Sequence, residues 1–428
     1  MMDKVIYLNS GKCGWGKCIF CGWGMKESRV KSIHELKRML DEIFLTEKFD
    51  RLKIFNSGSF LDERQVPRAF RSYVVRKCEA AGVKELVVES RGEYFTKEFV
   101  DDMKSDRVKV SIGYGLEVAD DEMLNKLQKG TTAADFVKAS EFLHKNGFLM
   151  RAYVLVNAPY TTRESLRKTM DIALKNADSI CMMNWFPHGA SKAFDLWAER
   201  KWKMLTEKEF NEWTDEFKDR KVEKYFDEFS FTPKWPIAKQ LPIKGATEKE
   251  LLHPYYEVWQ EYINGFWKKN KDKDILLFIP CSFRKPYFCS QLHKAIFSVL
   301  DKLPIKEKLQ VCAISSPGVI PYEFVNFYPF NRYDWPEWEE TAEIKKKYTE
   351  VTQARVENFL RAHGNQYRRI YCYFKPDAES YIALKQACKK LGIKLIDCLK
   401  ESTYEEIKNE KNPLSLPQAL EDLKDSLS

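Results

Sequence analysis

Short apolar runs alternate with amphipathic segments along the first part of the chain, up to about residue 185. The runs are rich in β-branched residues, which favour strands, and the segments between them repeat apolar residues at helical spacing. The expected strands are 4–8, 51–56, 84–89, 108–114, 149–156 and 179–184. The expected helices are 32–46, 65–81, 96–103, 120–127, 133–145 and 162–175. Strands separated by such helices predict right-handed βαβ crossovers and a parallel sheet, so we expect a partial (β/α)6 barrel.

A proline-rich boundary separates this region from a second α/β region. Between residues 231 and 245, prolines and a glycine interrupt the hydrophobic pattern, which is typical of a linker. Beyond it the expected helices are 248–268, 290–300, 335–363 and 377–391, and the expected strands are 274–280, 308–314, 369–374 and 393–398. We therefore expect a first domain over 1–240, a smaller Rossmann-like α/β domain over 245–410 and a solvated helical tail over 411–428.

The composition indicates a soluble cytoplasmic protein. Of the 428 residues 44% are hydrophobic, and the 11 cysteines lie at irregular spacings that do not resemble a secreted disulfide framework. The first ten residues are too few and too polar for a signal peptide. No apolar run approaches the roughly 18 to 20 residues that cross a bilayer, so we expect no membrane contact. The net charge of +8 is compatible with an RNA partner but is a weak signal in a protein of this length.

Three cysteines lie close together in the loop that follows the first expected strand. Cys13, Cys18 and Cys21 have the spacing C-x4-C-x2-C, and the next cysteine is Cys78 in an expected helix. A structural zinc site has four ligands, whereas a catalytic centre keeps one position open. A plant-type ferredoxin begins with this spacing but needs a fourth cysteine. An iron–sulfur centre with one open iron is the leading interpretation, and a zinc site completed by His34 or three structural cysteines are the alternatives.

Glycine-containing and polar motifs follow the next expected strands. They are NSGSFLD at 56–62, ESR at 89–91 and GYGLE at 113–117. A turn of small residues lets backbone groups approach a ligand closely. Together with the cysteine loop, these motifs resemble the radical S-adenosylmethionine (SAM) superfamily, and the SGSFLD and ESR forms are similar to the radical SAM subunit of archaeosine synthase. The usual cysteine spacing in the superfamily is C-x3-C-x2-C, so this loop is one residue longer.

This resemblance implies a radical SAM barrel, a 4Fe–4S cluster held by the three cysteines, and SAM on the open iron. The residues that it implies for cofactor binding are Phe20, Gly58, Ser59, Glu89, Ser90, Arg91 and Glu117. In such enzymes an electron from the reduced cluster cleaves SAM, and the resulting 5′-deoxyadenosyl radical abstracts hydrogen from substrate. An electron donor, which the sequence does not identify, is therefore an expected partner.

Reactive side chains gather in the segment 280–293, PCSFRKPYFCSQLH, after an expected strand of the second region. A strand end that leads into a helix can present a nucleophile together with acid or base partners. Ser290 and His293 are three residues apart, so a helix that starts there places both on one face. A small core cysteine and a packed or capping histidine are the alternative.

The pattern P-C-x3-K-P-Y-x2-S-x2-H is similar to the signature of the archaeosine synthase core domain. In that family this domain joins free lysine to the nitrile of 7-cyano-7-deazaguanine at position 15 of tRNA. The segments 315–323, 328–329 and 333–334 also resemble the family. The candidate catalytic residues that the resemblance implies are Cys281, Lys285, Tyr287, Ser290 and His293.

The two resemblances extend over nearly the whole protein and imply a bifunctional enzyme, a lysine transferase and a radical SAM lyase, with 7-deazaguanine-modified tRNA and free lysine as partners. Two alternatives stay open. One is a radical SAM enzyme that modifies another 7-deazaguanine base, free or in DNA, with a second domain that only docks substrate. The other is a non-catalytic iron–sulfur protein that binds RNA. Cleavage of SAM under reducing anaerobic conditions separates the enzymes from the binding protein.

Overall fold

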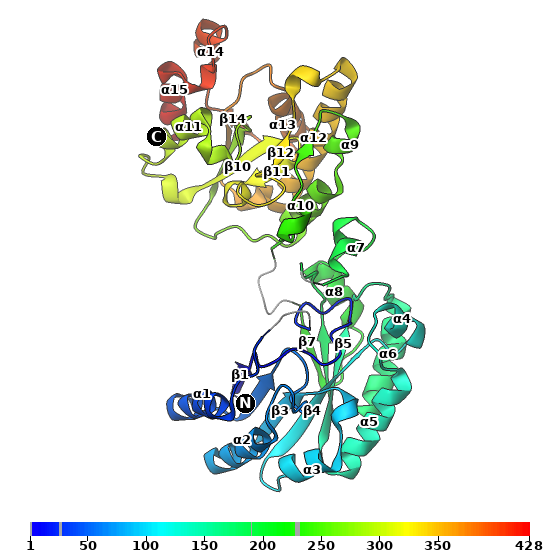
Figure 1. Ribbon diagram of the computed structural model, residues 1–428. Coiled ribbons are helices and arrows are strands. Elements are labelled where there is room, and N and C mark those ends of the chain that lie inside the picture. Colours follow the sequence, from blue (N-terminus) through cyan, green and yellow to red (C-terminus); the bar gives the residue numbers. More distant parts are fainter. Residues whose placement is uncertain (1, 25–27, 190, 227–231) are drawn as a thin grey trace. The chain divides into compact units, whose positions relative to one another are not determined.

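A computed structural model describes residues 2–24, 28–189, 191–226 and 232–428. The protein divides into two compact units, Met1–Phe231 and Thr232–Ser428, and each unit has a sheet of its own (Figure 1). The division therefore falls somewhat before residue 240, where we expected the first domain to end.

The first unit is built on a curled parallel sheet of seven strands that follow one another in sequence order. The strands are β1 (Asp3–Tyr7), β2 (Arg51–Phe55), β3 (Glu85–Glu89), β4 (Lys109–Glu117), β5 (Leu149–Leu155), β6 (Ser179–Met183) and β7 (Val222–Tyr225). Each strand pairs in parallel with the next. The expected partial barrel is confirmed, with β7 as a seventh strand that the pattern did not predict.

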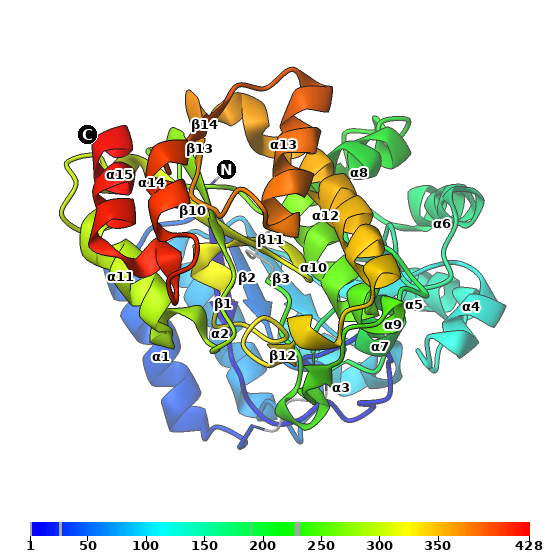
Figure 2. The same cartoon turned by 90° about the horizontal axis from the view of Figure 1, so that it is seen from above.

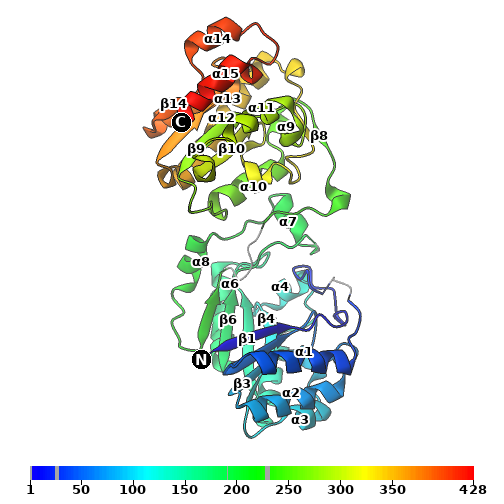
Figure 3. The same ribbon diagram turned by 90° about the vertical axis from the view of Figure 1, so that its left-hand side faces the viewer.

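Helices cover the outer face of this sheet (Figures 1 and 3). The covering helices are α1 (Ile33–Thr46), α2 (Arg68–Ala81), α3 (Lys97–Met103), α4 (Asp121–Lys126), α5 (Ala133–Lys145) and α6 (Arg163–Asn176). The helices α7 (Phe194–Ala198) and α8 (Glu207–Thr214) follow β6 in the sequence, and α7 lies beyond the carboxyl ends of the strands (Figures 1 and 3). Several of the covering helices have a Ser or Thr as N-cap. Its side chain accepts a hydrogen bond from a backbone N–H of the first turn, which has no partner within the helix. Ile54, Val88 and Ile112 point outward into one core with Leu40 and Phe99 of the helices.

The inner face of the sheet is polar instead. Arg151 of β5 is buried, and its Nη2 donates to Glu223 Oε2 of β7 at 2.6 Å. Arg51 of β2 donates to the same carboxylate at 3.4 Å. Because every second residue of a strand faces the same side, Glu223 and Tyr225 of β7 complete this inner surface, and the Tyr225 hydroxyl donates to Glu223 Oε2 at 2.8 Å. The inner face is therefore suited to hold polar ligands, and the carboxyl ends of all seven strands open at one edge.

The second unit has a five-stranded sheet in the order β11-β10-β9-β13-β14. Its strands are β9 (Ile275–Pro280), β10 (Leu309–Ser315), β11 (Gly318–Pro321), β13 (Arg369–Cys372) and β14 (Leu395–Asp397), and only β11 among them pairs antiparallel. A two-stranded ladder of β8 (Ile243–Lys244) and β12 (Tyr333–Asp334) lies apart from this sheet. The α/β architecture that we expected is confirmed.

Helices pack on both faces of the second sheet (Figure 2). They are α9 (Glu248–Leu251), α10 (Pro254–Gly265), α11 (Gln291–Leu300), α12 (Ala342–His363), α13 (Glu379–Leu391), α14 (Glu401–Ile407) and α15 (Pro417–Leu427). The helices α10, α12 and α13 pack together, and α11 packs with α15. The sheet is thus the middle layer of three.

Three expectations for this unit need correction. The helix expected at 248–268 is two helices, because the backbone turns at His253 and α10 begins with Pro254 in its first turn. The helix expected from Trp335 begins at Ala342, with Thr341 as its N-cap. The tail 411–428 is not solvated, since Leu423 and Leu427 of α15 are buried. Across the described ranges, we find no helix with the length and apolar character of a membrane span.

Candidate functional site

The cysteine loop leaves the carboxyl end of β1 and is held by the end of β2. Asn56 fixes the loop at Ser10: Ser10 N donates to Asn56 Oδ1, and Asn56 Nδ2 donates to Ser10 O, both at 2.9 Å. Gly58 lies directly against the first cysteine, because a Cβ at this position would stand 2.8 Å from Cys13 Cα. The NSGSFLD turn therefore fixes where the loop begins, and a side chain at Gly58 would displace it.

The three thiols of the loop are available as ligands for an iron–sulfur cluster. Cys13, Cys18 and Cys21 are all free and partly exposed. Among the described residues, no three His, Cys, Asp or Glu side chains converge on a point that would hold one ion. His34 is exposed on α1, so the zinc alternative gains no support. Cluster thiolates bind different irons and need not converge, so a set of three suits a 4Fe–4S cluster with one open iron.

Burial shapes the protonation of these thiols. It raises the pKa of Cys18 to about 11, and the nearby Lys129 ammonium opposes that shift. Burial also raises the pKa of Cys21, whose Sγ accepts a hydrogen bond from Gly24 N at 3.2 Å. Because a metal ligand must be a thiolate, binding of the cluster releases protons at this loop.

A buried ion pair lies beside the loop and was missed by sequence reasoning. Lys129 Nζ donates to Glu117 Oε1 at 2.6 Å, and the two side chains are 11% and 8% exposed. Burial lowers the pKa of Lys129, but the Glu117 carboxylate more than offsets this, so its pKa is raised. The ammonium also stands 5.8 Å from the ring centre of Phe20. Glu117, predicted from the GYGLE motif, is therefore engaged by a lysine that no local pattern indicated.

Arg91 of the ESR motif contacts three segments at the carboxyl ends of the strands: the turn after β2, the segment after α4 and the cysteine loop. Its backbone N donates to Ser59 Oγ at 3.1 Å, and its Nη1 donates to Lys129 O at 3.0 Å. Its guanidinium stands 4.9 Å from the ring centre of Trp15 in the cysteine loop. The structure thus brings Ser59 and Arg91 together and shows that both hold the loops in place, while their role in SAM binding stays a prediction.

Glu89, at the end of β3, is a carboxyl group that titrates near neutral pH. Burial raises its pKa to about 7, while Tyr153 opposes the shift. Gly113 on β4 leaves room beside it, since a Cβ there would lie 2.6 Å from the Tyr153 ring and 3.3 Å from Glu89 Cγ. Ser90 is tied to the same glycine, because its N donates to Gly113 O at 3.0 Å. The end of β3 therefore places a carboxyl group that can exchange a proton, Glu89, beside a residue without a side chain, Gly113.

In the second unit, Lys285 and Tyr287 meet at Tyr333 after the end of β9. Tyr287 is fully buried and shares a hydroxyl hydrogen bond with Tyr333, which shares another with Ser315 Oγ at 2.5 Å. Lys285 Nζ stands 3.9 Å from the ring centre of Tyr333. Burial raises the pKa of Cys281 while Lys285 opposes the shift, and burial lowers the pKa of Lys285. Cys281, Lys285 and Tyr287 therefore form one cluster of interacting groups.

Ser290 and His293 lie near this cluster, and the His293 ring centre stands 5.0 Å from that of Tyr287, but the side-chain hydrogen bonds of both residues are made outside the cluster. Ser290 is the N-cap of α11, and its Oγ accepts from His293 N at 3.1 Å. The His293 side chain is fully buried between Pro280 O, 3.0 Å from Nε2, and the Tyr322 hydroxyl, 3.2 Å from Nδ1. Burial lowers the pKa of His293 to about 4. A catalytic role for these two residues stays a prediction, and their contacts serve the helix start and the packing.

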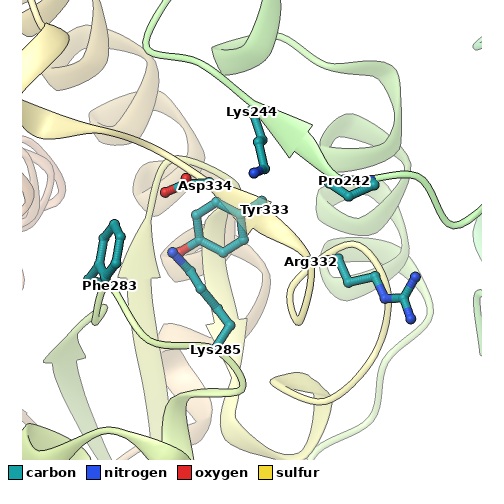
Figure 4. A pocket seen from close by; sticks show the side chains of 7 residues that line it. All are labelled: Pro242, Lys244, Phe283, Lys285, Arg332, Tyr333 and Asp334. Carbon is teal, nitrogen blue, oxygen red and sulfur yellow. The ribbon is translucent and has the colours of Figure 1, made fainter.

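A pocket of about 340 Å³ opens beside the cluster (Figure 4). Its lining residues are Pro242, Lys244, Phe283, Lys285, Arg332, Tyr333 and Asp334. Asp334 and Lys244 are register partners in the ladder of β8 and β12, so they stand side by side on the wall. The pocket therefore combines two lysine side chains, a guanidinium, a carboxylate and two aromatic rings, and one of the lysines, Lys285, interacts with the predicted nucleophile Cys281.

Family models match both units. The radical SAM superfamily matches residues 10–173, and a domain of unknown function, DUF5591, matches residues 257–414. The first unit is thus a radical SAM domain. The expected cofactors, a 4Fe–4S cluster and SAM, follow from this domain and its three cysteines.

Curated relatives of the protein include subunits of archaeosine synthase. Archaeosine synthase subunit beta of Methanosarcina acetivorans is 31% identical over 41% of this chain and 55% of its own length. Archaeosine synthase subunit alpha of Thermoplasma acidophilum is 28% identical over 32% of this chain and 26% of its own length. A solved structure, queuine lyase from Clostridium spiroforme bound to SAM and queuine, is 22% identical with a TM-score of 0.39, over 52% of this chain and 90% of its own length. The chain spans about half or less of these two curated relatives.

Proposed function

We propose that this protein makes archaeosine in tRNA by two consecutive reactions. The second unit joins the terminal amine of free lysine to the nitrile of 7-cyano-7-deazaguanine, and the first unit then splits the adduct between that nitrogen and the adjacent lysine carbon. A formamidine group is left on the base. The observation that carries this proposal is that one protein is similar to both the alpha and the beta subunit of archaeosine synthase.

In the second unit, the Cys281 thiol adds to the nitrile carbon. Lys285 takes the proton from sulfur and delivers it to the nitrile nitrogen, which gives a thioimidate. The lysine amine then displaces the thiol, which regains its proton. The support is electrostatic: Lys285 and Cys281 interact with each other, and burial lowers the pKa of Lys285 and raises that of Cys281, which favours the uncharged form of each group.

In the first unit, Cys13, Cys18 and Cys21 hold the cluster. When bound, the cluster and SAM supply a one-electron cleavage and a radical that abstracts hydrogen. The proposed SAM-binding residues lie at the ends of successive strands and in the cysteine loop: Phe20, Gly58, Ser59, Glu89, Ser90, Arg91 and Glu117. Glu89, with a pKa of about 7, can hold or release a proton there. The further partners are modified tRNA, free lysine and an electron donor in the cytoplasm.

A half-reaction tests the second unit alone. The full-length protein is incubated with ¹⁵N-labelled lysine and tRNA that carries the cyano base, without SAM, and the nucleosides are analysed by mass spectrometry. We expect a lysine adduct with the wild-type protein and none with Cys281→Ala. Cys289→Ala is the matched control, because this partly exposed cysteine lies on the same segment but interacts with Tyr322, whereas Cys281 interacts with Lys285. Equal adduct formation by Cys281→Ala and wild type would contradict the assignment.

A further inference from the structure

Two large aromatic side chains stand exposed at the pocket of the second unit. Phe283 is 67% exposed and Trp338 is 72% exposed, and their ring centres are 5.7 Å apart with an interplanar angle of 49°. Phe283 lines the pocket, whereas Trp338 does not line it and contacts Phe283. Large apolar side chains exposed together mark a binding surface more often than chance exposure does. Trp338 thus supports a flat wall that Phe283 offers to the pocket.

Polar groups at the pocket are left with unused hydrogen-bonding capacity. Within the described ranges, neither the Asp334 carboxylate nor Lys285 Nζ has an ion-pair partner within 4.0 Å. Figure 4 shows the carboxylate of Asp334, the ring of Phe283 and the ammonium of Lys285 around the same space. Burial lowers the pKa of Lys285, while Cys281, Asp334 and Glu337 each oppose this. Lys285 therefore interacts with both the thiol and the carboxylate.

We propose that this pocket binds a single unstacked guanine-type base, which stacks on Phe283 and places its N1–H and 2-amino group on the Asp334 carboxylate. This inference rests on the proposed function and assigns the residues that recognise its substrate. A carboxylate accepts two parallel N–H donors, and those are the donors on this edge of a guanine. Every base has a face that stacks on an aromatic ring.

The order of the groups also matches the order of atoms on the base. On a 7-cyano-7-deazaguanine, the 2-amino group, N1, O6 and the nitrile follow one another around the ring system. We place the 2-amino group and N1 on Asp334 and O6 toward Lys285. Lys285 interacts with both Asp334 and Cys281, so the nitrile, which follows O6 on the ring system, is directed to the Cys281 side of Lys285. A free amino acid has no flat face and would make no use of the aromatic wall. The base therefore fits the wall, the carboxylate, the ammonium and the thiol together.

Binding of 7-cyano-7-deazaguanine to the full-length protein, measured by calorimetry, tests the stacking wall. Phe283→Ala is expected to weaken binding about 5- to 150-fold, the range for loss of one base–aromatic stack, and Phe283→Tyr is expected to retain it. Phe288→Ala is the matched control, since Phe288 is 48% exposed on the same segment but does not line the pocket. Thermal melting checks that each variant is folded.

An analogue that lacks the 2-amino group tests the carboxylate. The wild type is expected to prefer the guanine-type base by about 10-fold or more, because a charge-assisted hydrogen bond is lost with the analogue. Asp334→Asn is expected to remove most of this preference, and the neighbouring exposed Glu339→Gln is expected to keep it. tRNA and DNA that carry the same base are used as competitors, and displacement of the free base by either one supports the site and identifies its source.

Unchanged base binding by Phe283→Ala and Trp338→Ala would overturn the stacking wall, and an unchanged preference in Asp334→Asn would overturn the edge contact. Loss of lysine binding without loss of base binding in these variants would show that the pocket holds the amino acid instead. Failure of the proposed function gives a different result: the base binds with the expected pattern of variants, but no lysine becomes attached to it.

Discussion

Replacing Lys129 by Met removes one partner of the buried ion pair beside the cysteine loop. Lys129 and Glu117 are 11% and 8% exposed, and their charged atoms are 2.6 Å apart. The variant keeps a side chain of similar length but leaves the Glu117 carboxylate buried without its cation. Removing one partner of a buried pair costs about 3 to 5 kcal/mol, because the remaining charge has lost both water and its counter-ion.

The expected change is large enough to separate from ordinary surface effects. For a unit of this size, 1 kcal/mol shifts the melting temperature by roughly 2 to 4 °C, so Lys129→Met is expected to melt about 6 to 20 °C lower. Lys126→Met is the matched control, since Lys126 pairs with Glu122 on the surface, with exposures of 51% and 78%. Water and salt screen such an exposed pair, so the control is expected to shift by at most about 2 °C.

Scanning calorimetry of the full-length apo protein measures these shifts, and hydrogen exchange of peptides from residues 109–145 assigns the transition to the first unit. The double variant Glu117→Gln with Lys129→Met removes both charges and is expected to recover much of the loss, as buried pairs replaced by neutral groups do. The reasoning is refuted if Lys129→Met melts together with the control, or if the double variant loses the sum of the two single effects.

Two further predictions concern the same edge of the first sheet. Gly58→Ala places a Cβ 2.8 Å from Cys13 Cα, so we expect the variant to bind clearly less iron and sulfide than the wild type on anaerobic reconstitution. Gly24→Ala is the control, because a Cβ at this position of the cysteine loop has its nearest neighbours at 3.6 Å, and we expect it to bind as much as the wild type. Equal iron content in the two variants would contradict this prediction. Burial raises the pKa of Glu89 to about 7 from 4.5, so its contribution to stability is complete below pH 4.5 and is lost as the pH rises toward 7. Glu89→Gln lacks this loss, and its melting temperature relative to wild type is expected to rise over that interval; parallel pH profiles of the two proteins would argue against the raised pKa.

The local pattern predicted those parts of the fold that are built from residues near one another in the sequence. From β1 to β6, the helices and strands were placed to within a few residues. The strand β7, Val222–Tyr225, was missed because its charged residues lack the apolar pattern of a strand. The partly buried position of Glu223 is explained by Arg151 of β5, which is far from it in the sequence and whose Nη2 donates to its carboxylate. Lys129 was missed for the same reason, since its partner Glu117 is brought to it by the path of the backbone after β4.

The candidate sites divide in the same way. The cysteine loop was predicted because three cysteines at close spacing in one short segment indicate a metal site without any information from the rest of the fold. The spacing of Ser290 and His293 allowed two interpretations. Two residues that are three apart can share one face of a helix, or the first can be the N-cap whose side chain accepts a hydrogen bond from the backbone N–H of the second. The structure shows the second arrangement. The pocket of the second unit was not predictable from local sequence. Its wall comes from a ladder that pairs Ile243–Lys244 with Tyr333–Asp334, far apart along the sequence.

The most direct test of the account is one anaerobic reaction of the reconstituted full-length protein with SAM, a reductant, tRNA carrying the cyano base, and lysine labelled with ¹⁵N in its terminal amine. Mass spectrometry of the nucleosides is expected to show the formamidine with the label retained, and the lysine adduct accumulating when SAM is omitted. A cyano base that stays unchanged under both conditions, while SAM is cleaved, would contradict the claim that the two units act on one substrate.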